Sequence, residues 1–291
     1  MVIPDTQKYS QNGDSTRFNA MMNWIVANQS SKSIMFVAGL GDIVEHNNNT
    51  GEFQVAQNAW NILDNNGSPL VPYSVIAGNH DFYQNGTSDT NYNTYFPYTR
   101  FTGYYWYGGN YPSNSYDNSY QLISVYGNDY LILNIATGPV YYNKGVEQWA
   151  NGILNQYSSR QAIFITHGYI DTTGALNDSS DTSGIEVWNN IVKLHSNVIM
   201  VCCGHAYSDN TVAGGEYNNI QIGVSGNIVQ QLLSDYQCTP NNGNGWLRYY
   251  TITPSTGTVQ AFTFSPTLNQ YDTDPKSQFT FTIPIQNWDY P

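Results

Sequence analysis

The stretch Val75-Ile76-Ala77-Gly78-Asn79-His80-Asp81 runs from an apolar segment directly into an amide, an imidazole and a carboxylate. This pattern predicts a buried strand over Tyr73 to Ala77 and a sharp turn of the backbone at Gly78. In open α/β sheets, ligands bind beyond the carboxyl ends of the strands. The polar residues after this strand are therefore expected where such a sheet places a binding site.

Four further stretches also run from an apolar strand into a carboxylate or an imidazole: Val2 to Gln7, Phe36 to Asp42, Phe164 to His167 and Val201 to His205. We expect all five strand ends to deliver potential metal ligands to one edge. The chain has only five histidines, and three of them, His80, His167 and His205, lie at these strand ends. Random placement of the histidines makes three of five at strand ends improbable.

Charged residues make up 10% of the chain, with 9 Lys+Arg against 21 Asp+Glu and a formal net charge of -12. No basic stripe is present, so nucleic-acid binding through phosphate neutralisation is not expected. No stretch is long and apolar enough to cross a bilayer. The abundance of Asn, Ser, Thr and Tyr is typical of a secreted protein. We therefore expect an extracellular or periplasmic location, with an export signal removed upstream of Met1.

Helical apolar stripes over Thr16 to Gln29 and Glu52 to Asn65 alternate with strands at a pitch that predicts an α/β fold. The sheet is expected to be parallel or mixed, with helices on its faces. Further strands are predicted over 220–224, 246–253, 258–264 and 279–285, and they extend or back a second sheet. No linker divides the chain, so residues 1–291 are interpreted as one domain that the strands from about 246 complete.

Residues 82–117 lack helical or strand periodicity and are interpreted as a long ordered loop. The loop carries the aromatic run Tyr104, Tyr105, Trp106 and Tyr107. One interpretation is a wall that stacks on a substrate ring. The other is that these four side chains simply pack the loop, in a chain with 25 Tyr.

The polar residues at the strand ends have the composition of a metal-binding set. Asp5, Asp42 and Asn79 would supply oxygen atoms, and the strand-end histidines would supply nitrogen atoms. This mixture suits Mn²⁺, Fe²⁺ or Zn²⁺ better than an ion that prefers thiolate ligands.

The motifs resemble those of the calcineurin-like metallophosphoesterases, and they stand in that family's order: Asp5-Thr6-Gln7, Gly41-Asp42, Gly78-Asn79-His80-Asp81, His167 and Gly204-His205. The Asp-Thr-Gln opening also resembles a subgroup of often secreted bacterial phosphoesterases. So do Asp235-Tyr236-Gln237 and Gly245-Trp246-Leu247-Arg248. The resemblance thus extends over nearly the whole chain.

The resemblance implies two packed mixed β-sheets flanked by helices, with a dinuclear metal centre that activates water to hydrolyse phosphate esters. Asp42 would bridge two divalent ions, which could be Mn, Fe, Zn, Mg or Ca. Asn79, His167 and His205 would hold one ion, and Asp5 the other. His80, oriented by Asp81, would protonate the leaving alcohol. The expected substrates are small organic phosphate diesters or monoesters.

Two positions depart from the family pattern, and both belong to the ion that Asp5 would hold. Gln7 and Tyr207 stand where the family has histidines. A glutamine oxygen binds metals more weakly than imidazole does, and a phenol must ionise or act only as a donor. His46 is a candidate substitute ligand, although a solvated loop residue is the simpler interpretation.

These departures leave a second hypothesis open. The chain could be a metal-depleted relative that binds carbohydrate or cell-wall material through aromatic loops without turnover. The cysteines also leave two hypotheses. Cys238 forms a disulfide with Cys202 or Cys203, or all three thiols are reduced.

Overall fold

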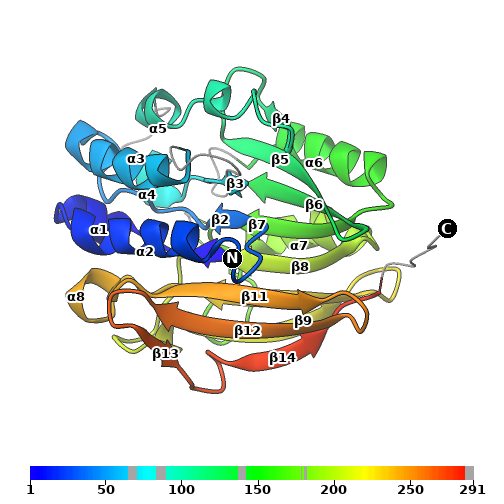
Figure 1. Cartoon of the computed structure of the whole chain (residues 1–291). Coiled ribbons are helices and arrows are strands. Elements are labelled where there is room, and N and C mark those ends of the chain that lie inside the picture. Colours follow the sequence, from blue (N-terminus) through cyan, green and yellow to red (C-terminus); the bar gives the residue numbers. More distant parts are fainter. Residues whose placement is uncertain (65–70, 83–89, 137–141, 178, 180–181, 286–291) are drawn as a thin grey trace.

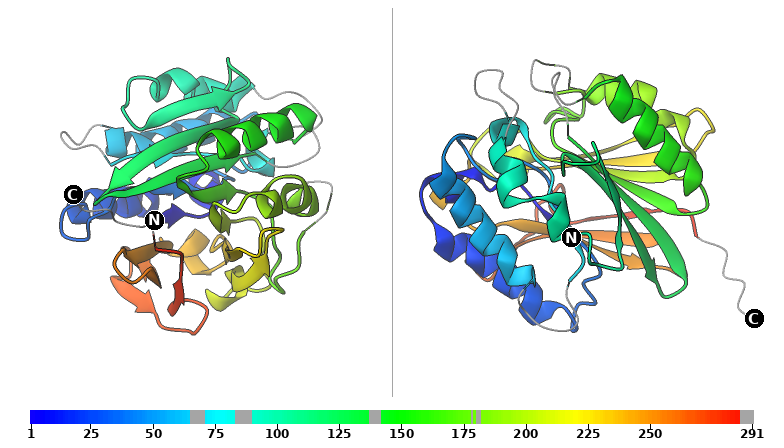
Figure 2. Two further views of the ribbon diagram at one scale, coloured as in Figure 1. Left: turned by 90° about the vertical axis from the view of Figure 1, so that its right-hand side faces the viewer. Right: turned by 90° about the horizontal axis from the view of Figure 1, so that it is seen from above.

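The computed structural model of the chain describes residues 1–64, 71–82, 90–136, 142–177, 179 and 182–285. Two seven-stranded sheets pack against each other, and helices cover their outer faces (Figure 1). The view from above in Figure 2 shows the helices of the first hundred residues and helix α6 on opposite outer sides. The predicted α/β fold of two mixed sheets flanked by helices is thus confirmed.

The first sheet has the strand order β13-β12-β11-β1-β2-β3, with β14 paired to β12. Its parallel part joins β1 (Val2–Ile3), β2 (Val37–Gly39) and β3 (Tyr73–Ser74). The predicted strand at Tyr73 is shorter than expected, although Val75, Ile76 and Ala77 stay buried. The antiparallel part comprises β11 (Leu247–Thr253), β12 (Thr258–Ser265), β13 (Gln270–Asp272) and β14 (Phe279–Thr282). These strands continue the sheet that contains β1.

The second sheet has the order β4-β5-β6-β7-β8-β10-β9. Its strands are β4 (Tyr107–Tyr111), β5 (Asn118–Val125), β6 (Asn128–Ile135), β7 (Gln161–Thr166), β8 (Val198–Cys203), β9 (Glu216–Ile222) and β10 (Ile228–Ser234). Strands β6, β7, β8 and β10 are parallel, and antiparallel strands flank them.

The two long N-terminal helices are α2 (Ser15–Asn28) and α3 (Thr50–Asp64). Phe18, Met21, Met22 and Ile25 of α2 are fully buried, which confirms the predicted apolar stripe. The remaining α-helices are α1 (Gln7–Gln11), α4 (Asn79–Phe82), α5 (Thr90–Tyr95), α6 (Lys144–Gln156), α7 (Gly184–Asn190) and α8 (Pro240–Gly243). Among the described residues, no helix combines the length and apolarity that crossing a membrane requires.

The strands of the second sheet divide their side chains between two apolar cores. On β6, Ile132 enters the core between the sheets, whereas Leu131 and Leu133 enter the core beneath α6 and α7. Successive side chains point to opposite faces of a strand, so one strand serves both cores. Cys202 and Cys203 on β8 are divided in the same way.

Two expectations need correction. The segment 82–117 contains α5, a 3₁₀ turn at Tyr98–Arg100 and strand β4 within its described part, because its aromatic side chains are core residues. Phe96, Phe101 and Trp106 are almost completely buried. The predicted disulfide is also wrong, since all three cysteines are free.

Candidate metal centre

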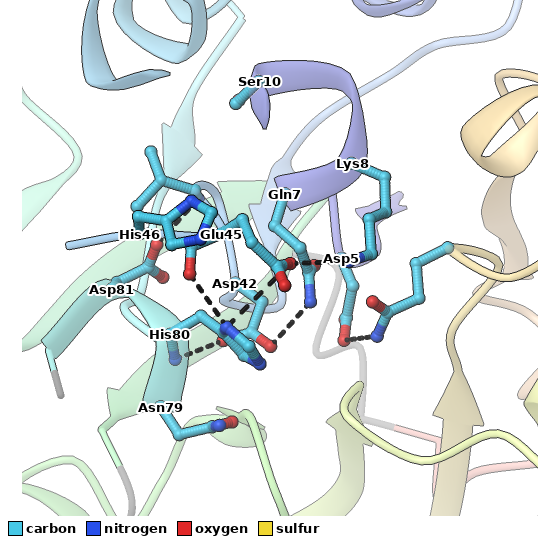
Figure 3. Close-up of polar contacts among 12 residues, drawn as sticks. Asp5, Gln7, Lys8, Ser10, Asp42, Glu45, His46, Asn79, His80 and Asp81 are labelled. Carbon is cyan, nitrogen blue, oxygen red and sulfur yellow. Dashed lines mark hydrogen bonds and ion pairs between the residues drawn. The ribbon is translucent and has the colours of Figure 1, made fainter. Parts of the chain in front are cut away.

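The ligand-bearing segments come from both sheets. Asp5, Asp42 and Asn79 follow β1, β2 and β3 of the first sheet, and His167 and His205 follow β7 and β8 of the second. The expectation of one sheet edge is therefore wrong. The carboxyl ends of the two sheets instead meet, and their polar residues form one cluster between them. Figure 3 shows the first sheet's contribution, with Asp5, Asp42 and Asn79.

One group in the described part of the chain has the composition of a metal site. Ligand atoms of Asp42, His167 and His205 all lie within 4.8 Å of one another. The side-chain oxygen of Asn79 joins them, 2.9 Å from His167 Nε2 and 3.0 Å from His205 Nδ1. His167 Nε2 is also 3.3 Å from Asp42 Oδ1 and 3.2 Å from His205 Nδ1.

These spacings fit a shared ion. Atoms that bind one ion at about 2.1 Å lie roughly 3.0–3.4 Å apart in octahedral or tetrahedral coordination. The ring orientation of His167 agrees, because its Nδ1 lies 2.9 Å from the carbonyl oxygen of Leu40. A carbonyl only accepts, so Nδ1 carries a proton, and Nε2 is the nitrogen that can bind an ion once its own proton is displaced. The residues present therefore fit a divalent metal.

The backbone around Asp42 is folded tightly enough to exclude side chains. Gly41 has φ +97°, and a Cβ there would lie 2.7 Å from His167 Nδ1 and 2.8 Å from the Gly78 nitrogen. Asp42 itself has φ +49°, a conformation that Asp tolerates better than most residues do. This turn is what brings the Asp42 carboxylate beside the two histidines.

The Asp81 carboxylate contacts this turn and does not contact the His80 imidazole. Its Oδ1 accepts hydrogen bonds from the backbone N–H of Ile43 at 2.8 Å and of Val44 at 2.9 Å. Its Oδ2 accepts another from the N–H of Gly78 at 2.8 Å. The expectation that Asp81 orients the His80 imidazole is therefore corrected: its carboxylate joins the Asp42 turn to the Asn79 turn.

The side of Asp42 that faces Asp5 has buried oxygen atoms without partners. Asp5 is 3% exposed and Gln7 1% exposed. Asp5 Oδ1 and Gln7 Oε1 have no hydrogen-bond partner within the described ranges. A buried acceptor without a donor costs about 1–3 kcal/mol, and a cation is one species that relieves this cost. This half of the cluster also fits a metal.

The electrostatics of Asp5 and His167 lead to the same conclusion. Burial, and next the nearby charge of Asp235, raise the pKa of Asp5 well above its ordinary value. Burial lowers the pKa of His167, but the Asp42 carboxylate outweighs it and raises this pKa to about 10. Without a cation, the carboxylates are thus balanced by a proton on an imidazole. Metal binding would displace that proton.

His80 lies beside this cluster. Its backbone N–H donates to Asp42 Oδ1 at 3.0 Å, and its ring Nδ1 lies 3.0 Å from the carbonyl oxygen of Glu45. Burial lowers the pKa of His80, whereas the Asp42 charge and the Glu45 carbonyl raise it, and the net shift is upward. These groups therefore stabilise the protonated imidazole more than water does, with Nδ1 engaged by the Glu45 carbonyl.

His46 and Tyr207 each have a side-chain partner that is not one of the candidate ligands. His46 Nδ1 pairs with Glu52 Oε1 at 2.8 Å, and its side chain is 41% exposed. Tyr207 is 47% exposed. A hydrogen bond with Cys238, followed by the charge that this side chain acquires when it ionises, raises the pKa of Tyr207 to about 12. The phenol therefore stays protonated at neutral pH, which disfavours it as a metal ligand.

The segment from Tyr104 to Tyr107 packs at the end of β3 that is opposite to the candidate ligands. Trp106 is 1% exposed and contacts Tyr73, which begins β3, whereas Asn79 follows the other end of that strand. Tyr104 stacks on Trp106, and Tyr105 is 88% exposed. Their placement corresponds to the packing interpretation rather than to a wall of the metal cluster.

Two residues that were not among the expected site residues lie next to Asp5. Gln237 Nε2 is 3.5 Å from Asp5 Oδ2 and 2.9 Å from Asp235 Oδ2. The signal was present in the sequence, since Asp235-Tyr236-Gln237 is one of the motifs that carry the family resemblance. Their position more than 200 residues from Asp5 concealed the contact.

Comparisons with known proteins agree with this geometry. The family model described as calcineurin-like phosphoesterase matches residues 1–208. The uncharacterised protein YvnB of Bacillus subtilis (strain 168) is 32% identical over 290 residues, which is 98% of this chain. The chain spans only 21% of the length of that relative.

A solved structure shares the fold. Purple acid phosphatase PPD1 from yellow lupin (Lupinus luteus) matches with a TM-score of 0.51 and 14% identity, over 91% of this chain and 49% of that one. The 5'-nucleotidase of Candida albicans SC5314 matches with a TM-score of 0.44 and 10% identity, over 98% of this chain and 51% of that one. With its ordered motifs, its cluster of ligands and the family match, this chain belongs to the calcineurin-like phosphoesterase family.

Proposed function

We propose that this chain hydrolyses phosphate esters of small organic alcohols at a centre of two divalent ions. The observation that carries the proposal is the arrangement around Asp42. On one side lie the Asn79 oxygen and the nitrogens of His167 and His205, and on the other lie the partnerless oxygens of Asp5 and Gln7. Family membership supports metal-dependent phosphoester hydrolysis in general.

When bound, the two ions would supply Lewis-acid activation of water and neutralise charge on the phosphoryl oxygens. The residues of the chain would perform the remaining steps. Asp42 would hold both ions in place, and the His205 N–H, which donates to Asp5 Oδ2 at 2.8 Å, would orient the Asp5 carboxylate. His80 would donate a proton to the departing alcohol, for which its raised pKa suits it.

Small substrates fit the charge of the chain. With a net charge of -12, the molecule repels large polyanions, whereas a small diester or monoester meets this field only weakly. We propose diesters first and monoesters second. The alternative function is a metal-depleted relative that binds carbohydrate. Of the run Tyr104 to Tyr107, Trp106 is buried and only Tyr105 is fully exposed, which offers little aromatic surface for such a ligand.

The test is turnover of a chromogenic phosphodiester and a chromogenic monoester by the purified chain. Each is assayed after removal of metals and after addition of Mn²⁺, Zn²⁺ or Mg²⁺. We expect hydrolysis that needs added metal and is abolished in Asp42→Asn. Asp209→Asn removes an exposed carboxylate and serves as the matched control. Absence of turnover with every metal, together with binding of a polysaccharide, would favour the alternative.

A further inference from the structure

The Gln7 side chain occupies the position between Asp42 and Asp5 (Figure 3). Its Nε2 donates a hydrogen bond to Asp42 Oδ2 at 3.0 Å. Its Oε1 is buried and has no partner in the described part of the chain. In the absence of an ion this is the required orientation, because turning Oε1 towards Asp42 would place two acceptors against each other. The amide group therefore satisfies the carboxylate and leaves its own oxygen unsatisfied.

Asp5 is held by only one of its two oxygens. Its Oδ2 accepts hydrogen bonds from the His205 N–H at 2.8 Å and from Gln237 Nε2 at 3.5 Å. Gln237 is itself fixed, because Asp235 Oδ2 accepts from the same nitrogen at 2.9 Å. Asp5 Oδ1 is left buried without a partner among the described residues. Gln237 and Asp235 thus fix which Asp5 oxygen is available.

Among the described residues, the candidate metal ligands on this side of Asp42 are all oxygen atoms. The atoms that could bind an ion are Asp5 Oδ1, Asp42 Oδ2 and, after rotation of the amide, Gln7 Oε1. His167 and His205 belong to the opposite side, where they face Asn79. Lys8 follows Gln7 in the sequence, and its amine is engaged by Glu45 Oε2 at 2.8 Å. Carboxylate and amide oxygens favour hard ions such as Mg²⁺, Mn²⁺ and Ca²⁺ over Zn²⁺.

We propose that the ion on the Asp5 side is held by oxygen atoms alone, and that Gln7 gates its binding. Rotation of the Gln7 amide by about 180° exchanges Nε2 and Oε1, which are nearly equal in size. The residue then gives up its hydrogen bond to Asp42 and presents its oxygen. This inference rests on the proposed function, because it concerns the same centre, and it predicts two ions of unequal affinity and different type.

The experiment is a metal titration of stripped protein, followed by calorimetry and by elemental analysis after dialysis. In the wild type we expect one Zn²⁺ retained per chain and a second, weaker ion that is Mn²⁺ or Mg²⁺ rather than Zn²⁺. Gln7→His should strengthen the second Zn²⁺ by at least about tenfold, since even groups that merely support a ligand change metal affinity roughly 10–100-fold. Gln7→Met is close in size and should lose the weak ion but keep the Zn²⁺.

Two further measurements make the test specific. The exposed Gln11 lies on the same helix, so Gln11→His adds an imidazole outside the cluster and should change neither ion. The Gln7 side-chain amide signal in a ¹⁵N NMR spectrum, identified by its loss in Gln7→Met, should shift when Mg²⁺ is added after Zn²⁺. Circular dichroism checks that each variant folds. If Gln7→Met does not fold, Gln7→Glu replaces it, and this variant should strengthen Mn²⁺ binding.

Each outcome bears on a definite claim. Two Zn²⁺ ions of equal affinity in the wild type, or an unchanged weak ion in Gln7→Met, would overturn the gating role of Gln7 and leave the proposed hydrolase intact. An amide signal that does not respond to Mg²⁺ would do the same. If no ion binds tightly to the wild type, the proposed function itself fails.

Discussion

The Asp81 carboxylate lies against the main chain of Ile43, whose N–H donates to Asp81 Oδ1 at 2.8 Å and to Oδ2 at 3.1 Å. This contact links two turns that are 38 residues apart in the sequence. One of the turns presents Asp42 and the other presents Asn79. The candidate ligand cluster therefore depends on a residue that contributes no ligand atom to it.

Asp81→Ala is expected to lower the free energy of unfolding by at least about 1–3 kcal/mol, because it leaves buried N–H donors of Ile43, Val44 and Gly78 unsatisfied. Urea unfolding of stripped protein measures this change. Metal affinity should fall as well, since the Asp42 turn loses its support. Asp209→Ala removes an exposed carboxylate and should change the free energy of unfolding much less. Equal stability of the two variants would refute the anchoring role of Asp81.

His80→Ala is expected to reduce turnover of the chromogenic ester by roughly 10²–10⁴-fold while metal content stays nearly unchanged, because its proposed role is proton transfer. Asp42→Ala should lose metal and activity together. Elemental analysis and steady-state kinetics on the same preparations separate the two effects. His46→Ala, which alters a histidine paired with Glu52, is the matched control. Equal metal loss in the His80 and Asp42 variants would show that their roles are not distinct.

The two sheets are joined by a buried ion pair between Arg248 of β11 and Glu216 of β9. Both side chains are fully buried, and Glu216 also accepts hydrogen bonds from Tyr236 and Ser277. Arg248→Met should destabilise the protein by about 3–5 kcal/mol, because it leaves the carboxylate buried without its charge partner.

The double variant Arg248→Met with Glu216→Leu should recover part of this loss, since it removes both charges. Denaturant unfolding of the two single variants and the double variant forms the test cycle. Purely additive losses would argue against a direct coupling of the two sheets through this pair.

Trp106→Ala is expected to destabilise the protein by about 3–5 kcal/mol, the usual cost of removing a large buried aromatic side chain. Trp106 is 1% exposed and stacks on Tyr104. The KM for the chromogenic ester should stay unchanged, as measured below the unfolding transition. Tyr105→Ala, at an exposed position, should affect neither quantity. A higher KM in Trp106→Ala that is still folded would instead support the interpretation that Tyr104 to Tyr107 form a wall that stacks on the substrate.

The sequence was informative about the ligands because each of them follows an apolar strand within a few residues. Asp42 comes three residues after β2, and His167 immediately after β7. Local patterns of this kind need no knowledge of pairing between distant strands. The family resemblance rested on the same motifs, and both the α/β prediction and the family were confirmed.

The division of these ligands between two sheets could not be predicted locally, because strand pairing is a long-range property. Strand β10 was missed since Gln230 and Gln231 interrupt its apolar pattern, although both are buried. Gln231 is accommodated because its Nε2 donates to the Tyr169 hydroxyl at 3.0 Å. The role of Asp81 was misassigned for a related reason: its partners are backbone N–H groups, which carry no sequence signal.

Anomalous diffraction from crystals of the chain loaded with Zn²⁺ tests the central claim most directly. The account predicts a peak between Asp42, Asn79, His167 and His205, at about 2.0–2.2 Å from His167 Nε2 and from His205 Nδ1. Data recorded with Mn²⁺ present should add a second peak beside Asp5 Oδ1. A cluster that holds no peak at saturating metal, with both imidazoles in the positions described above, would contradict the assignment of this site as a metal centre.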